Sequence, residues 1–363
     1  MALQVGLVGL PNVGKSTLFN AVSQAGAEAA NFPFCTIDPN VGVVAVPDER
    51  LDRLAELAAS AKVVPTAIEF VDIAGLVAGA SQGEGLGNQF LAHIREVDAI
   101  CNVVRCFEND DIIHVSGAID PANDIEVIDT ELILKDLETV EKRADRAQRT
   151  AKSGDKDAVR ERDQVIALRD HLAQGLPARS FDREIDPTLR RELGLLTSKP
   201  VLFAANVAED DLPDGNEHVE VVKKIAERQG AEVVVISAQV EAELAELGNE
   251  EREEFLTSLG LESSGLERLI ERAYQLLGLL TFFTAGPTES RAWTVPEGST
   301  APRAAREIHT DFERGFIKAE VIAFDDYDHL GSEAAARDAG RLRIEGKDYL
   351  VADGDVIHFR FNV

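Results

Sequence analysis

The stretch that decides the fold is GLPNVGKST, residues 9–17. It follows a mainly apolar run, residues 3–8, that predicts a buried strand, and it leads into a pattern that predicts a helix opening at Lys15. A glycine-rich turn between a strand and a helix lets backbone N–H groups face a phosphate, while Lys15 adds positive charge and Ser16 a hydroxyl ligand for Mg²⁺. The stretch therefore predicts a nucleoside triphosphate site whose contacts come from Asn12, Val13, Gly14, Lys15, Ser16 and Thr17.

Further apolar runs surround this stretch in an alternating strand and helix pattern. They predict strands at residues 41–46, 67–71, 99–104, 201–205 and 232–236. Strands that alternate with helices indicate an α/β fold with a mainly parallel sheet covered on both faces. The runs at residues 99–104 and 201–205 are separated by nearly a hundred residues, so we expect an insertion between them.

The expected insertion, residues 127–195, has a helical pattern. Apolar residues recur at spacings of four and three, which is a coiled-coil seam: Ile133, Leu137, Val140, Ala144, Ala147 and Ala151. A second helix is expected over residues 157–174, with a turn at residues 153–155. The sequence therefore predicts an antiparallel helical hairpin.

Charge is distributed unevenly between this hairpin and the rest of the chain. The whole chain has a formal net charge of −28, which disfavours general affinity for nucleic acid. The hairpin is balanced, and its basic residues cluster: Lys142, Arg143, Arg146, Arg149, Lys152 and Lys156. Two interpretations stay open, a solvated face with salt bridges or a basic edge that contacts RNA phosphates.

The last 85 residues or so have a different pattern. Strands are expected at residues 280–284, 290–295, 316–324 and 356–363, with a short helix at 301–308. We expect a small mixed sheet packed on one helix. The domain prediction is therefore a P-loop domain over residues 1–126 and 196–278, the insertion 127–195, and a C-terminal domain 279–363.

A second phosphate motif follows the predicted strand 67–71. Asp72-Ile73-Ala74-Gly75 places a carboxylate that can hold Mg²⁺ through water and a Gly75 N–H that can contact the γ-phosphate. Thr36 lies between the two motifs and is the candidate to complete the metal shell. The predicted Mg²⁺ ligands are therefore Ser16, Thr36 and, through water, Asp72.

The residue after Gly75 is Leu76, and its side chain cannot orient the attacking water as a glutamine does at this position in many related GTPases. Hydrolysis must then be slow, use another residue or await a partner. His114 is a candidate, although a lone histidine is more often structural.

The base-recognition motif also departs from the usual pattern. The predicted strand 201–205 ends in Asn206-Val207-Ala208-Glu209, where GTPases of this type have Asn-Lys-x-Asp. Glu209 places its carboxylate one methylene further out than aspartate, which disturbs the hydrogen-bond fork to guanine. We expect Asn206 to bond the purine N7 and an exocyclic amine, and Ser237-Ala238 to close the base pocket.

Taken together, these motifs resemble the YchF subfamily of Obg-related NTPases over essentially the whole chain. The stretches that carry the resemblance are Asn12–Thr17, Asn31–Ile37, Asp72–Leu76, Asn206-x-x-Glu209 and the ending DGDVIHFRFN, residues 353–362. The resemblance implies a G domain, a coiled-coil insertion and a C-terminal TGS domain of β-grasp shape.

The resemblance also implies chemistry and partners. It implies preference for ATP over GTP, association with ribosomes and a catalytic role for His114. The basic insertion and the TGS domain are the expected contacts with rRNA. Asn12 matches a P-loop asparagine that supports K⁺ in some relatives. The expected location is the cytoplasm, with no membrane partner and with Cys35, Cys101 and Cys106 as reduced thiols.

Two alternatives of different kinds stay open. One is a GTP-specific switch, which nucleotide competition would reveal. The other is a nucleotide-gated scaffold with negligible hydrolysis, an interpretation that Leu76 favours. Single-turnover rates with and without ribosomes distinguish an enzyme from a scaffold.

Overall fold

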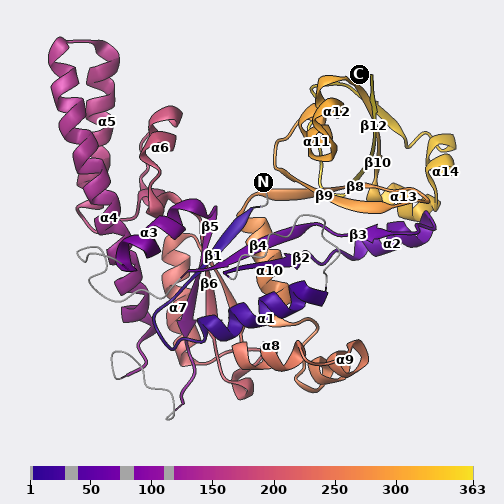
Figure 1. Cartoon of the computed structure of the whole chain (residues 1–363), viewed down its shortest axis with the longest axis horizontal. Helices are drawn as coiled ribbons and strands as arrows, with labels where there is room; N and C mark the ends of the chain where they lie inside the picture. Colours follow the sequence, from indigo (N-terminus) through magenta and orange to yellow (C-terminus); the bar gives the residue numbers. More distant parts are fainter. Residues whose placement is uncertain (1–2, 29–39, 74–85, 110–117, 363) are drawn as a thin grey trace. The chain divides into compact units, whose positions relative to one another are not determined.

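The chain forms two structural units that differ from the domain boundaries expected from the sequence. The computed structural model describes residues 3–28, 40–73, 86–109 and 118–362. One unit comprises Met1–Val44 and Glu69–Ala273, and the other comprises Ala45–Ile68 and Tyr274–Val363. The sequence predicts residues 45–68 as part of the P-loop domain, whereas in the structure they belong to the same compact unit as the C-terminal residues. Figure 1 labels most of the helices and strands of both units.

The first unit is built on a six-stranded sheet of order β2-β4-β1-β5-β6-β7. The strands span Val41–Ala45 (β2), Ala67–Asp72 (β4), Gln4–Val8 (β1), Ala99–Arg105 (β5), Val201–Asn206 (β6) and Glu232–Ile236 (β7). The pairs from β4 through β7 are parallel. The edge strand β2 runs antiparallel to β4. Two backbone hydrogen bonds show this: Val46 N–H donates to Thr66 O, and Asp72 N–H donates to Asn40 O.

The central strands explain why the sequence predicted this sheet well. Every residue of β5 and β6 is buried, as expected for parallel strands covered on both faces. Val8 lies opposite Asn102, and Arg105 lies opposite Asn206. The carboxyl ends of β1, β5 and β6 therefore meet at one edge of the sheet, where ligands bind in open α/β folds.

Helices and short 3-10 turns complete the first unit. The helices outside the insertion span Lys15–Glu28 (α1), Leu86–Glu96 (α3), Glu217–Gln229 (α7), Ala238–Leu244 (α8), Asn249–Ser258 (α9) and Gly265–Leu276 (α10), the last of which crosses into the second unit. The 3-10 turns in and after the insertion span Ala151–Ser153 (η1), Ala178–Ser180 (η2), Leu196–Ser198 (η3) and Glu209–Asp211 (η4).

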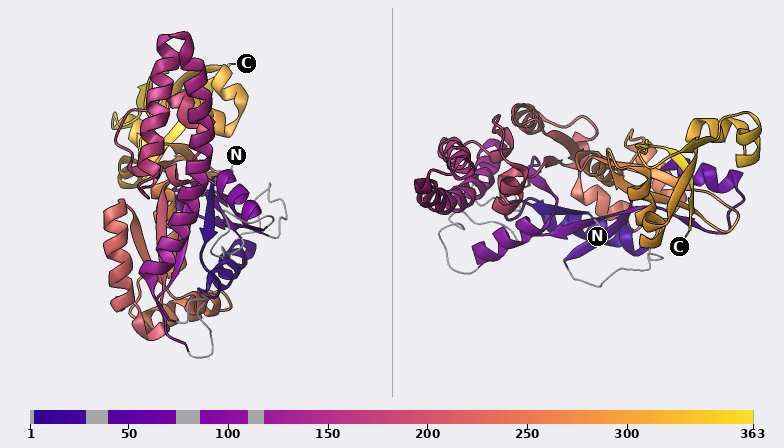
Figure 2. Two further views of the ribbon diagram at one scale, coloured as in Figure 1. Left: turned by 90° about the vertical axis from the view of Figure 1, so that its left-hand side faces the viewer. Right: turned by 90° about the horizontal axis from the view of Figure 1, so that it is seen from above.

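The expected helical hairpin is present, and its first helix starts six residues earlier than the expected insertion. It consists of α4 (Pro121–Thr150) and α5 (Lys156–Leu172), followed by α6 (Pro187–Leu193), and Figures 1 and 2 show α4 and α5 side by side. The predicted seam is buried at Ile133, Val140, Ala144, Ala147 and Ala151. The turn forms as expected, because Gly154 takes the left-handed conformation and the Asp155 side chain caps α5.

The second unit contains its own six-stranded sheet, of order β11-β10-β12-β8-β9-β3. Its strands span Arg343–Glu345 (β11), Phe316–Ala323 (β10), Asp355–Phe361 (β12), Leu279–Thr284 (β8), Ser290–Pro296 (β9) and Val63–Val64 (β3). Its helices span Glu49–Leu57 (α2), Ala301–Ile308 (α11), Thr310–Arg314 (α12), Phe324–Leu330 (α13) and Glu333–Asp338 (α14).

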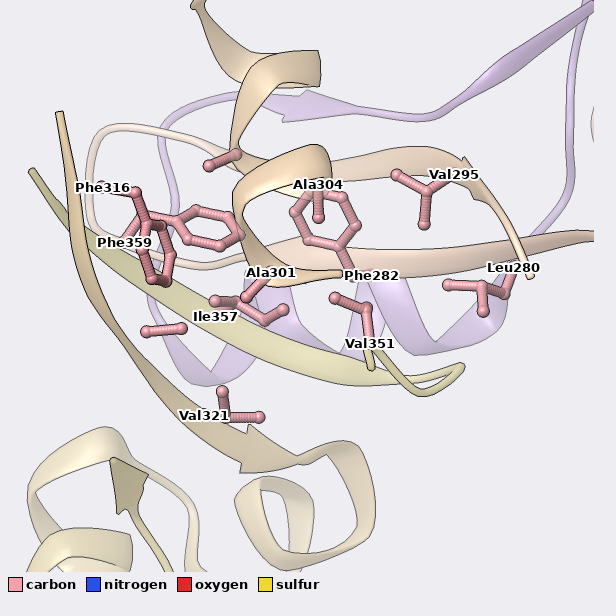
Figure 3. Close-up of a cluster of buried hydrophobic side chains, with 12 residues drawn as sticks. Leu280, Phe282, Val295, Ala301, Ala304, Phe316, Val321, Val351, Ile357 and Phe359 are labelled. Atoms are coloured by element: carbon pink, nitrogen blue, oxygen red, sulfur yellow. The ribbon is translucent and has the colours of Figure 1, made fainter. Parts of the chain in front are cut away.

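This sheet is covered on both faces, which corrects the prediction of a sheet packed on one helix. On one face Ala301 and Ala304 of α11 pack with Phe282 and Phe359, as Figure 3 shows. On the other face Leu51 and Leu54 of α2 pack with Phe283, Ile322, Tyr327 and Val356. The helix α2 was missed because its partners lie more than two hundred residues away in the sequence. None of the helices in the described residues is long and apolar enough to cross a membrane.

Candidate nucleotide-binding site

The phosphate loop connects β1 to α1 and includes a left-handed backbone conformation that favours glycine. Gly14 has φ 91° and Asn12 has φ 65°, and Gly14 O accepts a hydrogen bond from Leu18 N–H in the first turns of α1. Turns in which residues of positive φ alternate with others direct successive N–H groups toward one point and form an anion-binding concavity. The loop geometry thus agrees with the phosphate site expected from the sequence.

Two glycines of this loop have no room for a side chain. A Cβ on Gly9 would lie 2.8 Å from the carbonyl oxygen of Val103 in β5. A Cβ on Gly14 would lie 2.1 Å from Nδ2 of Asn206 in β6. The glycines therefore allow the loop to pack directly on the strands beneath it.

Lys15 and Asp72 meet at the start of α1. The Lys15 ammonium contacts the Asp72 carboxylate, and the lysine is 8% exposed. The carboxylate is positioned at the end of β4, next to β1. The cation expected to bind phosphate and the carboxylate expected in the Mg²⁺ shell are thus adjacent, although they lie 57 residues apart in the chain.

Ser16 and Thr17 follow Lys15 in the first turn of α1, and both are exposed. Their hydroxyls are therefore accessible at the helix N-terminus, where the unpaired N–H groups also favour an anion. Ser16 directly follows Lys15 in the sequence, and this position is consistent with its predicted role as a metal ligand.

Asn206 holds the phosphate loop and the segment predicted to bind the base together. It is 3% exposed at the end of β6, where its Nδ2 donates to Val13 O at 2.8 Å. Its Oδ1 accepts from Ala238 N–H at 2.9 Å. The sequence predicts that this side chain contacts the purine; the structure adds contacts from both ends of its amide to the protein backbone. An asparagine amide has a second Nδ2 hydrogen and a second Oδ1 lone pair besides those used in these two contacts.

The other predicted base-pocket residues lie beside this clamp. Val207 is buried and its N–H donates to Ile236 O at 2.9 Å, while Ser237 is buried at the start of α8. Glu209 begins η4 and is exposed, so its carboxylate faces solvent at the rim. The structure thus brings Asn206, Val207, Ser237 and Ala238 together and leaves Glu209 at their edge.

Four residues of the predicted site lie outside the described residues: Thr36, Gly75, Leu76 and His114. Their roles in the metal shell, γ-phosphate contact and catalysis stay predictions.

Sequence reasoning overlooked Arg105, which ends β5 at the same sheet edge and is 1% exposed. The sequence does show a charged residue directly after a mainly apolar run. The predicted strand ended at residue 104, so Arg105 was not considered part of it.

The described cysteines have no role in this chemistry. Cys101 and Cys106 are buried free thiols, and burial raises the pKa of each to about 12. They stay protonated and unreactive at neutral pH, which agrees with the expectation of reduced thiols. Cys35 lies outside the described residues.

Two protein-family models match the chain. A model described as "50S ribosome-binding GTPase" matches residues 4–142. A second model, YchF-GTPase_C, described as "Protein of unknown function (DUF933)", matches residues 279–362.

Full-length relatives and a solved structure are similar to this chain. It is 58% identical to "Ribosome-binding ATPase YchF" of Bacillus subtilis and 56% identical to the protein of that name in Escherichia coli O157:H7, with all of each chain covered. The structure of the Schizosaccharomyces pombe YchF GTPase superposes with a TM-score of 0.90 at 38% identity, covering 99% of this chain and 97% of that one. A GTP-binding protein of Pyrococcus horikoshii, at 22% identity and a TM-score of 0.61, shares the fold.

Proposed function

The chain belongs to the YchF family, and from this premise we propose that it is a ribosome-associated ATPase that uses Mg²⁺ and accepts GTP more weakly. The observation that carries the proposal is the contact of Lys15, where the phosphate loop enters α1, with Asp72 at the end of β4, beside a loop that Asn206 clamps. The similar bacterial proteins are named as ribosome-binding ATPases. A ribosomal partner would place this activity in the cytoplasm.

The residues at the sheet edge fit Mg²⁺. Ser16 is exposed, and the Asp72 carboxylate at the end of β4 contacts Lys15, the residue directly before it. Oxygen ligands of this kind, with water, are what Mg²⁺ prefers, and Thr36 is the proposed third contributor. When bound, the ion neutralises charge on the phosphates. Asn12 is the proposed neighbour of a K⁺ ion.

The chain's own groups would supply binding and orientation. Lys15 would turn from Asp72 toward the β- and γ-phosphates, and the loop N–H groups would stabilise charge that develops during hydrolysis. Gly75 N–H would contact the γ-phosphate. Because Leu76 has no polar atom to orient water, we assign that role to His114.

Nucleotide competition tests the proposed preference for adenine. Glu209 should disfavour guanine, and Asn206 should accept either purine. We expect unlabelled ATP to displace a fluorescent ATP analogue at a concentration several-fold lower than GTP, and Glu209→Asp to narrow that difference. A large preference for GTP in the wild type would establish the rival GTP-specific switch.

Single-turnover hydrolysis tests whether the protein is an enzyme or a scaffold. We expect Lys15→Ala to abolish tight ATP binding, whereas His114→Ala should keep binding and slow hydrolysis by about 10²-fold or more, the usual contribution of a positioned acid–base group. If ribosomes and His114→Ala both leave the rate unchanged, the nucleotide-gated scaffold is the better description.

The described contacts divide the basic residues of the insertion into two sets. Lys142 pairs with Glu138, and Arg143 donates to Glu161 at 2.7 Å and to Glu192 at 3.0 Å. No ion pair in the described parts of the chain occupies the exposed cations nearer the hairpin turn: Arg146, Arg149, Lys152 and Lys156. We define these four residues as the tip cations. The first set agrees with a solvated salt-bridged face, and the tip cations support the RNA interpretation.

Ribosome pelleting over a salt series tests the tip cations. Arg149→Ala with Lys152→Ala should weaken pelleting and lower the slope of log affinity against log salt by on the order of 1 for each lost phosphate contact. Lys142→Ala, in the same helix but from a paired lysine, is the matched control and should change little. Absence of pelleting in every nucleotide state at low salt would refute the ribosomal role, including a contribution from the C-terminal TGS domain.

A further inference from the structure

A groove lies between α5 and the segment 181–184, which belongs to the chain that leads from α5 to α6 (Figure 1). Its volume is about 410 Å³, which falls within the roughly 300–1,000 Å³ of pockets that hold small ligands. One wall is a single face of α5, because its residues recur at spacings of one, three and four: Lys156, Val159, Arg160, Asp163, Gln164 and Ala167. The opposite wall is formed by Phe181, Arg183 and Glu184. We call the cavity between these two walls the α5 groove.

The opposite wall is held in place by contacts with the hairpin. Gln164 Nε2 donates to the carbonyl oxygen of Glu184 at 3.3 Å, which joins α5 to this wall. Phe181 packs against the hydrophobic core of the hairpin, and its ring meets the ring of His171 edge-on with 5.2 Å between the centroids. The His171 ring also contacts Pro177 O at 3.1 Å. The α5 groove is therefore shaped by contacts of its own walls.

The rim of the α5 groove carries cations that the protein leaves largely uncompensated. No ion pair or hydrogen bond with a described residue occupies the side chains of Lys156 and Arg183. Arg160 lies 3.9 Å from the Glu184 carboxylate, but these side chains are 61% and 84% exposed, and such exposed pairs contribute little. Asp163 already accepts a hydrogen bond at 2.6 Å from the arginine directly before it. On a chain of net charge −28, the groove is thus a local site for an anion.

We infer that the α5 groove binds one unpaired nucleotide of RNA, with the base on its apolar floor and the phosphates at its cationic rim. The floor is formed by residues less exposed than the cations, namely Val159, Ala167 and Phe181. A flat base can pack on this surface and stack on the guanidinium planes of Arg160 and Arg183. A base inside a duplex has both faces covered by its neighbours, so only an unpaired base can enter. The inference deepens the proposed function, on which it rests, by naming the kind of RNA element that is recognised.

The tip cations lead directly into this groove. Lys156 belongs to both sets, since it is a tip cation and also opens the α5 wall. A strand whose phosphates contact Arg149 and Lys152 can therefore continue along Lys156 to the groove. An acidic peptide would also be attracted to the rim, but its carboxylates would gain nothing from the apolar floor. A nucleotide satisfies both the charge and the floor.

Fluorescence anisotropy of a labelled oligonucleotide tests the groove on the full chain. The probe is a fluorescein-labelled single strand of poly(A), compared with the same strand paired to poly(U). We expect the single strand to bind at least about fivefold tighter than the duplex, because only its bases are free to stack.

Two matched pairs of substitutions separate the groove from general charge. Arg160→Ala combined with Arg183→Ala removes two cations of the rim and should weaken binding of the single strand by about tenfold or more. Arg190→Ala combined with Arg191→Ala removes the same charge from exposed arginines of α6 that do not line the groove. This control should weaken binding by less than about twofold.

Ala167→Leu separates base insertion from attraction of the phosphates. It places a larger side chain on the floor of the α5 groove and leaves every charge unchanged. Binding of the single strand should weaken by at least about threefold, while duplex binding and the melting temperature stay as in the wild type.

The outcomes separate this inference from the function beneath it. Equal weakening by the two arginine pairs, equal affinity for strand and duplex, or displacement of the probe by poly-glutamate as readily as by unlabelled strand overturns the inference. If the wild type pellets with ribosomes and shows no preference for the single strand, the inference fails and the ribosomal role stands. If pelleting fails while the groove variants selectively lose the strand, the ribosomal role fails and the groove is supported as an RNA site.

Discussion

Replacing Asn206 tests whether one side chain holds the nucleotide site together. Asn206→Ala removes the donor to Val13 O and the acceptor for Ala238 N–H, both buried contacts of the clamp. Asn206→Asp is nearly isosteric and retains the acceptor, but it places a carboxylate oxygen where a donor stood 2.8 Å from Val13 O. The pair of variants therefore separates loss of the clamp from electrostatic repulsion of the phosphate loop.

The magnitude follows from the groups left without partners. A buried polar group that loses its hydrogen bond costs about 1–3 kcal/mol, so the two backbone groups together cost about 2–6 kcal/mol, shared between folding and nucleotide binding. If about 1.4 kcal/mol of this falls on binding, the dissociation constant for ATP rises about tenfold. Asn206→Asp should weaken binding at least as much, because the new charge also repels the triphosphate.

Fluorescent-nucleotide titration measures the part of this free-energy cost that falls on ATP binding, and denaturant unfolding measures the part that falls on folding. Asn216→Ala is the matched control, because this asparagine caps α7 and donates to Cys106 O and not to the phosphate loop. The control should lose about 1 kcal/mol of unfolding free energy, as typical caps do, and retain its ATP affinity. If Asn206→Ala binds ATP within about twofold of wild type and unfolds at the same denaturant concentration, the reasoning from the clamp is refuted.

Three further predictions concern the loop, the second unit and acid stability. Gly14→Ala should lower ATP affinity by about tenfold or more, since its Cβ would lie 2.1 Å from Asn206 Nδ2. Gly154→Ala, with a similar positive φ and no atom within 4 Å of its Cβ, should cost only about 1 kcal/mol of stability and leave ATP binding intact. ATP titration of both variants therefore distinguishes a steric clash from backbone strain. Leu54→Ala should destabilise the second unit by about 2–5 kcal/mol, because this α2 side chain is fully buried among C-terminal residues. The fluorescence of Trp293, the single tryptophan, reports the unfolding of this unit. An unchanged unfolding transition would contradict the assignment of α2 to the second unit. The Arg360 and Lys318 side chains lower the pKa of Glu320 to about 2. The contribution of Glu320 to stability is therefore complete above the ordinary glutamate pKa of 4.5 and is lost as the pH falls toward 2. Glu320→Gln should flatten this acid-side decline in unfolding free energy, and an identical pH profile would show that the contacts of Glu320 with these two cations contribute nothing.

The sequence predicted the sheet of the first unit because its strands carry local information. Runs such as those of β5 and β6 are apolar throughout, and the motifs follow directly where these strands end. The parallel register then brings the phosphate loop, Asp72 and Asn206 to one edge without any further information from distant residues.

The second unit was harder to predict because its assembly depends on distant partners. The strand β3 has two residues, Val63–Val64, and is too short to show alternation. Helix α2 is amphipathic, but nothing in its sequence says that its apolar side covers Phe283 and Val356. The short helices α13 and α14 left no pattern longer than seven residues.

Site chemistry was limited in a different way. A motif tells which residue types are present, and it does not tell which partners a polar side chain finds when buried. Asn206 was expected to contact a base, and its contacts with Val13 and Ala238 became visible only in three dimensions. Arg105 belongs to no motif, and only the folded chain shows that it is buried and donates to the carbonyls of Phe107 and Asn109.

The path of the chain between the two proposed Mg²⁺ ligands Thr36 and Asp72 bears on how a nucleotide signal could spread. Residues 45–68 lie between these ligands in the sequence, yet they belong to the second unit, where α2 and β3 pack. The strand β2 therefore leaves the first unit after Val44, and β4 returns to it at Glu69 and ends at Asp72. A nucleotide that repositions Asp72 acts on a strand whose other end is anchored in the second unit. Covalent continuity thus ties the second unit to the proposed metal-binding edge through both strands.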